Sequence, residues 1–205
     1  NSLNLIYENA ATIGSFDLGI YKTSDGYNSI LKDLEDHKFE IIFLFGQDNL
    51  KFKKQNEFII YQGSHGDKGA EIADIILPGA AYTEQNGYYT NLEGKLQRAY
   101  KASYPPGEAK EDWQIINDLA ELINQKKLFK DKEELESSMI NYINLFKKRN
   151  ASKKNSDNIN LEFISENIIT NKIDYYYSNV IARASKTMSE CRNEKINMKI
   201  TANNN

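Results

Sequence analysis

The sequence contains one cysteine, Cys191, in 205 residues. A disulfide within the chain is therefore impossible, and zinc or iron–sulfur sites that need several cysteines are excluded. The two histidines, His37 and His65, argue against a dedicated metal site. The sequence also lacks an apolar run long enough to span a bilayer and a recognisable secretory signal.

The chain has no strong excess of charge of either sign, because its formal net charge is −3 and its pI is about 5.6. A general nucleic-acid-binding protein would carry a basic patch or a high pI, so that class is disfavoured. With 40% hydrophobic and 27% charged residues, the composition suits a globular protein. The length suffices for one α/β domain with an extension.

The stretch from Phe58 to Gln97 carries most of the information in the sequence. Two short apolar runs, at 58–61 and 75–77, have the composition of strands. Between them lies the glycine-rich loop Gly63–Gly69, which leads into a helix start at 70–73. This order predicts a strand, a glycine loop, a short helix and a second strand.

Upstream, Ile41–Phe45 is continuously apolar and is bounded by Gly46. Such a run predicts a strand that is buried on both faces, as in a parallel sheet. Helical spacing at 27–36 and a short helix ended by Gly19 precede it. Helices interleaved with buried strands indicate the α/β class, with a parallel sheet in a Rossmann-like layered domain.

Downstream, residues 88–101 predict extended or hairpin structure, and Pro105–Gly107 is a clear break. Two amphipathic helices follow, one opening at Glu111–Asp112 and one along 135–146. A polar linker at 151–160 and a last helix at 182–195 are expected. The α/β core is therefore placed at 1–128 and a helical and irregular C-terminal extension at 129–205.

The loop Gly63–Gly69 has the spacing G-x-x-G-x-x-G, which is not the dinucleotide fingerprint. Backbone amides at the helix start could hold a phosphate or pyrophosphate. The alternative is a tight turn that needs positive φ at one or more glycines. Spacing alone favours the turn and leaves both interpretations open.

Other chemistry-bearing residues are scattered. His65 could act as an acid–base group, whereas His37 ends a charged helix and is expected to be solvated. Cys191 is expected to be an isolated thiol. Tyr175–Tyr177 could stack on a partner, although packing onto a neighbouring surface is the simpler expectation. The candidate acids are Asp67, Glu71, Asp74, Glu84 and Glu93, of which Asp67 and Glu71 suit a solvated loop and helix cap.

A longer pattern runs through this stretch: the glycine loop, then A-x-x-A-D-x-x-L-P-G, then E-x-x-G-x-x-x-N-x-E-G-x-x-Q. The matching residues are Ala70, Ala73, Asp74, Leu77, Pro78, Gly79, Glu84, Gly87, Asn91, Glu93, Gly94 and Gln97. This pattern resembles the C-terminal half of the large iron–sulfur subunit of respiratory complex I (NADH:quinone oxidoreductase), within the molybdopterin oxidoreductase superfamily. The segments 17–19, 105–107, 111–113 and 181–188 are also similar to that family.

The resemblance implies a piece of a larger molybdopterin-oxidoreductase-like fold. The family's iron–sulfur ligands lie in an N-terminal part that cannot be matched to any residue here, so the clusters are expected there or in a partner chain. No catalytic, cofactor-binding or metal-binding residue is assigned in this chain. The implied function is a scaffold in the peripheral arm that supports NADH-to-quinone electron transfer. A fragment of an active molybdopterin enzyme, such as a formate dehydrogenase, and an independent nucleotide-binding module remain as alternatives.

The expected partners are other peripheral-arm subunits, including the cluster-bearing N-terminal half, with no nucleic acid and no direct membrane insertion. The frequent Asn, Lys and Ile residues and a first residue other than Met favour the matrix side of the mitochondrial inner membrane. The cytoplasmic face of a bacterial membrane is the alternative. The sheet is expected to have an edge or face that the missing half covers.

Overall fold

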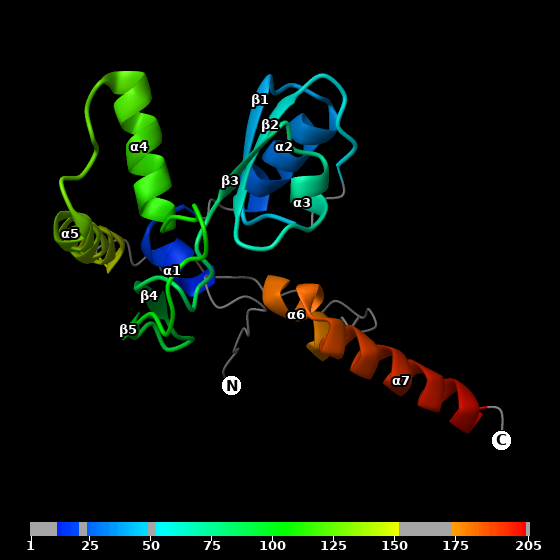
Figure 1. Cartoon of the computed structure of the whole chain (residues 1–205). Coiled ribbons are helices and arrows are strands. Elements are labelled where there is room, and N and C mark those ends of the chain that lie inside the picture. The colour runs from blue at the N-terminus through cyan, green and yellow to red at the C-terminus, as the bar shows by residue number, and fades with distance from the viewer. Residues whose placement is uncertain (1–11, 21–23, 49–51, 152–173, 204–205) are drawn as a thin grey trace, which may run out of the picture.

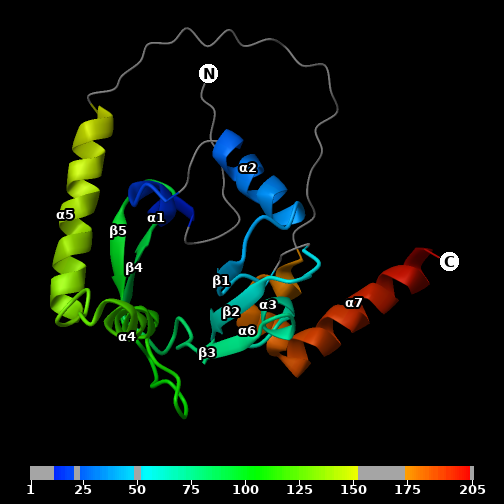
Figure 2. The same cartoon turned by 90° about the horizontal axis from the view of Figure 1, so that it is seen from above.

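The computed structural model describes residues 12–20, 24–48, 52–151 and 174–203 (Figures 1 and 2). The described elements are α1 (Thr12–Asp17), α2 (Ser24–Glu35), β1 (Ile41–Phe45), β2 (Phe58–Gly63), α3 (Lys68–Glu71), β3 (Ile75–Pro78), β4 (Gly87–Thr90), β5 (Leu96–Ala99), α4 (Asp112–Asn124), α5 (Lys132–Ala151), the 3-10 turn η1 (Tyr175–Tyr177), α6 (Val180–Ala184) and α7 (Lys186–Asn203). The expected α/β class is confirmed.

The strands β1, β2 and β3 form a parallel sheet in that order. Ile42 pairs with Ile59 and Leu44 with Tyr61, so these side chains share one face. Leu44, Ile59 and Tyr61 form the buried core on that face. Residues of α3 and of the connections around it pack against this core: Phe52, Ala70, Ile72 and Ala73.

The opposite face of the sheet is open. Ile41, Phe43 and Phe45 of β1 are 59%, 39% and 58% exposed, and Phe58 of β2 and Ile75 of β3 are 43% and 44% exposed. The prediction that residues 41–45 are buried on both faces is therefore wrong within this chain, although the strand itself is confirmed. The register places all five side chains on one face, which we call the open face. An open face of this kind agrees with the expectation for a sheet that another part covers.

A second unit is built around the antiparallel hairpin β4–β5, confirming the extended structure predicted at 88–101. Gly94 has a φ of +79° in the connecting turn, a conformation that favours glycine. The helix α1 contacts β4 and α5, and Gly19 follows it with a φ of +67°, as predicted for its end. The expected boundary at residue 129 stays a prediction.

The helix α4 begins at Asp112 with Glu111 as its N-cap, as the sequence predicted. The side chain of Gln114 accepts a hydrogen bond from the Glu111 backbone N–H at 3.2 Å, which satisfies a donor that the helix leaves free. The buried side chain of Asn117 accepts from the backbone N–H groups of Leu128 and Phe129, and donates to the carbonyl of Phe129. These bonds fix the turn between α4 and α5.

The C-terminal segment differs from its prediction. Instead of one helix over 182–195, the chain forms α6 and α7 with a break at Ser185, whose backbone is extended at φ −80° and ψ 120°. Asn179 caps α6 by accepting from the N–H of Ala182 at 2.9 Å. Residues 152–160 of the expected linker lie outside the described residues. Figure 2 shows α7 projecting from the body beyond α6.

Candidate functional site

The glycine loop Gly63–Gly69 connects the end of β2 to α3. Its glycines Gly63, Gly66 and Gly69 are absent from the positive-φ positions of the described residues, where the glycines are Gly19, Gly46, Gly94 and Gly107. The positive-φ explanation for this glycine spacing is therefore wrong. The spacing requires another physical reason.

That reason is the side chain of Tyr61, which is 1% exposed. A Cβ atom added at Gly63 would lie 2.4 Å from the Tyr61 hydroxyl oxygen, and one added at Gly69 would lie 2.8 Å from the Tyr61 ring. A Cβ atom at Gly69 would also lie 2.5 Å from the carbonyl oxygen of Gln47. The absence of side chains at Gly63 and Gly69 thus makes room for a buried phenol ring.

The hydroxyl of Tyr61 lies 3.2 Å from the Asp48 carboxylate and 3.2 Å from the carbonyl oxygen of His65. Asp48 is 3% exposed and also accepts from the backbone N–H of Gly69 at 3.3 Å. Burial, followed by the neighbouring Asp48 carboxylate, raises the pKa of Tyr61 to about 12. Burial likewise raises the pKa of Asp48 above its ordinary value. A neutral phenol therefore bridges the loop to the end of β1.

The side chain of Arg183, from the C-terminal segment, forms ion pairs with Asp48 and with Asp67 of the glycine loop. Arg183 of α6 donates from Nε to Asp67 Oδ2 at 2.6 Å, and its Nη2 lies 3.8 Å from Asp48 Oδ2. Asp67 also accepts from the N–H of Lys68 at 2.9 Å and caps α3, as predicted. The guanidinium therefore ties α6 to the glycine loop through two carboxylates.

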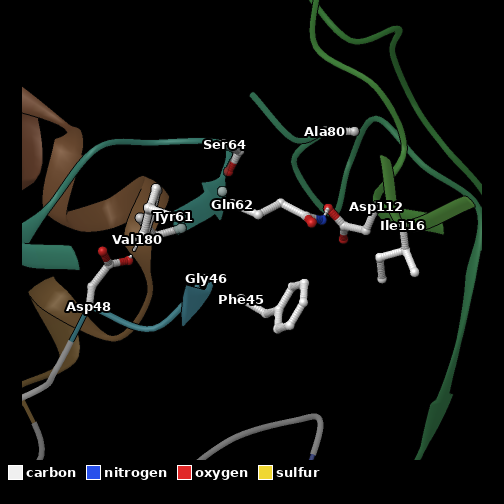
Figure 3. Close-up of a pocket in the computed structure, with 11 residues that line it drawn as sticks. Phe45, Gly46, Asp48, Tyr61, Gln62, Ser64, Ala80, Asp112, Ile116 and Val180 are labelled. Atoms are coloured by element: carbon white, nitrogen blue, oxygen red, sulfur yellow. Dashed lines mark hydrogen bonds between the residues drawn. The ribbon is translucent and has the colours of Figure 1, made fainter. Parts of the chain in front are cut away.

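A cavity of about 330 Å³ adjoins the loop at the carboxyl ends of β1 and β2 (Figure 3). Gln62 points across it toward Asp112, and its amide donates to Asp112 Oδ1 at 2.8 Å. Gln85 donates to the other oxygen of Asp112 at 2.9 Å. The two carboxylates that line the cavity, Asp48 and Asp112, give it an acidic lining that disfavours a phosphate group.

The loop therefore does not fit the phosphate or pyrophosphate group that its position before a helix suggested. The ring of Tyr61 fills the space beside Gly63 and Gly69, and Asp48 and Asp67 already pair with Arg183, the cation that faces the loop from α6. The helix α3 is only 4 residues long, and Asp67 already accepts from its first N–H. We therefore derive no cofactor chemistry from this loop.

The remaining sequence candidates have structural contacts. Asp74 accepts from the N–H of Ile59 at 2.8 Å and from Lys54 Nζ at 2.6 Å, so it fastens the start of β2. These two hydrogen bonds, the backbone one first, lower the pKa of Asp74. Glu84 accepts from the N–H of Ala81 at 2.9 Å and closes a turn. Glu71 and Glu93 are exposed.

The two histidines, His37 and His65, make different contacts. His37 is hydrogen-bonded to Glu57, which is 4% exposed, and to Gln55, and its side chain is 27% exposed, so it is only partly solvated. His37 also has a φ of +54°, and its ring centroid lies 5.6 Å from that of Phe52. His65 lies 2.9 Å from the hydroxyl of Ser64 in the loop. Neither histidine forms, with other His, Cys, Asp or Glu side chains in the described ranges, a group that could hold a metal ion.

Two of the three tyrosines of η1, Tyr176 and Tyr177, contact side chains of α7, whereas Tyr175 is 75% exposed. The Tyr177 hydroxyl donates to Ser189 Oγ at 3.0 Å, and Arg192 lies 4.8 Å from the centre of the Tyr177 ring. Lys195 lies 5.2 Å from the Tyr176 ring. Cys191 is an exposed free thiol. Among the described helices, none is both long and apolar enough to cross a membrane.

Sequence reasoning missed Asp48 and Arg183. Asp48 follows the carboxyl end of β1, an edge where functional groups gather in parallel sheets, and that position was the available signal. Arg183 lies 135 residues further along the chain, in a segment that the sequence marked only by its resemblance to the family.

Comparison with known proteins supplies the decisive observation. The molybdopterin oxidoreductase family profile matches residues 1–122. The chain belongs to the molybdopterin oxidoreductase family. Residues 134–191 match a second family, described as the C-terminal part of the G subunit of NADH-ubiquinone oxidoreductase. The expected resemblance to the large complex I subunit is therefore confirmed.

Curated relatives agree with this assignment. The chain is 37% identical over 198 residues to the NADH-ubiquinone oxidoreductase 75 kDa subunit of Reclinomonas americana, covering 93% of this chain and 28% of that protein. It is 40% identical over 202 residues to the G subunit of the NADH-quinone oxidoreductase of Rickettsia bellii, covering 95% and 28%. It is 36% identical over 206 residues to the mitochondrial NADH-ubiquinone oxidoreductase 78 kDa subunit of Candida albicans, covering 93% and 27%. The chain thus spans under a third of the length of these relatives.

Proposed function

We propose that this chain is a structural portion of the peripheral arm of NADH:quinone oxidoreductase. In this role it holds the cluster-bearing part of the large subunit in place and supports NADH-to-quinone electron transfer without binding a redox centre itself. The open face carries the proposal, because five large apolar side chains there are each at least 39% exposed. Exposed apolar patches of this kind mark surfaces that other protein covers.

The chemistry of the glycine loop supports the same role. Tyr61, Asp48, Asp67 and Arg183 bond to one another or to the backbone, which fixes α6 and α3 on the sheet. Groups committed to packing in this way hold a shape. The partners are then the other peripheral-arm subunits, first among them the iron–sulfur part of the same subunit. The location is the matrix side of the mitochondrial inner membrane or the cytoplasmic face of a bacterial membrane.

Isolation of the tagged chain from its native membrane fraction tests this proposal. We expect flavin and several iron–sulfur clusters to copurify, detected by absorbance and by electron paramagnetic resonance. An untagged strain carried through the same steps gives the background. Recovery of molybdenum and a pterin instead would favour an active enzyme such as a formate dehydrogenase, an alternative that the relatives above do not support. Recovery of the chain without flavin or clusters would refute the proposal.

A further inference from the structure

The helix α4 begins beside the carboxyl ends of β2 and β3, on the side of the open face. Figures 1 and 2 show α3 and α4 on opposite sides of the parallel sheet. The hydrogen bond from Gln62 of β2 to Asp112 holds the first turn of α4 close to the carboxyl end of the strands. Gly79, which follows β3, bridges in parallel to Lys110, which precedes α4. The open face and α4 therefore form two walls that are joined at one end.

Both walls carry large apolar side chains, next to the charged residues that also line the two cavities. A cavity of about 550 Å³ lies between Leu77 of β3 and the α4 residues Ile115, Leu119 and Leu122. The cavity of about 330 Å³ described above is lined by Phe45 from the sheet and by Ile116 from α4, together with the two carboxylates named there. We call this space, between the open face and α4, the α4 cleft. Leu122, which lines the larger cavity, is 82% exposed.

The occupant of the α4 cleft is elongated. The apolar strip continues from Phe45 through Phe43 to Ile41, and across to Phe58, beyond the residues that line either cavity. A small ligand in one cavity would leave most of this strip in water. A secondary-structure element that runs along the strands would cover it, and helices are the elements that cover parallel sheets.

The described chain supplies no such helix, for a topological reason. The connection from β1 to β2 places Phe52 on the core face, and the connection from β2 to β3 places α3 there. Right-handed crossovers that advance in one direction lie on one face of the sheet. The opposite face is covered by helices whose strands extend the sheet in the other direction, here beyond the edge strand β1.

We propose that the α4 cleft is filled by one helix from the cluster-bearing part of the same subunit. This inference rests on the function proposed above. The relatives supply the length, since this chain spans only 27–28% of them. The helix is apolar on two opposite sides, because one side meets Phe43 and the other meets Leu122. Its polar groups face Lys110 and Asp118, which border the larger cavity. A strand that follows or precedes it pairs with β1.

Photo-crosslinking in the assembled complex tests this proposal. p-Benzoylphenylalanine replaces Phe43 in one variant and Leu122 in another. In the control it replaces Tyr104, which is 77% exposed and lines neither cavity. We expect Phe43 and Leu122 to crosslink to one segment of the cluster-bearing part, at positions on opposite sides of a helix. The Tyr104 variant does not label that segment.

A charge in the cleft gives a second readout. Leu122→Asp places a carboxylate in an apolar interface and is expected to lower the amount of subunit in the complex about tenfold or more. The matched control Leu92→Asp alters a residue of the hairpin turn that is 57% exposed, and assembly stays unchanged. Crosslinks to a second copy, to another subunit or to lipid would overturn the proposal, as would normal assembly of Leu122→Asp. Failure of the proposed function is distinguishable, because the wild-type chain would then copurify without flavin and clusters.

Discussion

Substitution of Gly63 by alanine tests whether the glycine loop exists for the ring of Tyr61. A Cβ atom at Gly63 would lie 2.4 Å from the Tyr61 hydroxyl oxygen and 2.7 Å from the adjoining ring carbon. The ring cannot swing aside freely, because it is 1% exposed and its hydroxyl is bonded to Asp48. Gly66→Ala is the matched control, since its Cβ atom would meet nothing closer than the Cβ of Ala70 at 3.6 Å.

The two substitutions are expected to change the free energy of unfolding in opposite directions. Overpacking a filled core costs about 1–3 kcal/mol of unfolding free energy, which we expect for Gly63→Ala. Gly66 has no positive φ, so Gly66→Ala instead restricts the unfolded chain and stabilises by about 0.4–1 kcal/mol. If the clash is with Tyr61 alone, Gly63→Ala made in a Tyr61→Leu background loses most of its cost. The coupling energy of the pair is then about 1–3 kcal/mol.

Urea unfolding of the purified chain, followed by circular dichroism, measures these free energies. Hydrogen exchange of the β2 amides localises the effect to the predicted strand. The reasoning is refuted if Gly63→Ala is no more destabilising than Gly66→Ala, or if the cost persists after Tyr61 is shortened.

Three further outcomes follow from the contacts around the sheet. Because the pKa of Tyr61 is raised to about 12, its contribution to the free energy of unfolding is complete below its unfolded pKa of about 10 and is lost as pH rises toward 12. Ultraviolet titration of the phenol, together with urea unfolding at each pH, measures this loss. Because the pKa of Asp74 is lowered, its contribution is present above its unfolded pKa and is lost as pH falls through the folded value; Asp74→Asn flattens the acid limb of the stability curve. Arg183→Ala costs about 1–3 kcal/mol and speeds hydrogen exchange in α6, whereas Arg192→Ala, which breaks an exposed pair with Asp174, has a small effect on both.

Local pattern was enough to predict most of the strands and helices upstream of α6. The apolar runs at 41–45 and 58–61 became parallel strands, and Glu111 became the cap of α4, because short apolar runs and acidic helix starts depend on neighbouring residues alone. The single helix expected over 182–195 failed at Ser185. The extended backbone at that residue ends α6 and turns the chain into α7, and no glycine or proline signals it.

The site was less predictable because its contacts are distant in sequence. Arg183 and Asp67 are 116 residues apart, and no spacing rule joins them. His37 was expected to be solvated because its neighbours are charged, yet it bonds to Glu57, 20 residues away, under the start of β2. The glycine spacing could be recognised in the sequence, but the reason for it is the packing of the Tyr61 side chain against Gly63 and Gly69. Pattern identifies which residues are unusual, whereas packing decides what they are for.

The failed prediction at β1 carries the strongest functional argument. A strand that reads Ile-Ile-Phe-Leu-Phe has no polar side, so its composition suits burial on both faces. The chain buries Leu44 and leaves Phe43 and Phe45 at 39% and 58% exposed. Because each phenylalanine is already about half buried, completing its burial is worth roughly half of the 1.5–3 kcal/mol that full burial gives, and the open face carries three more large apolar side chains. Stabilisation of that size is available only to an assembly, so the sequence of β1 is that of a strand in the interior of a larger protein.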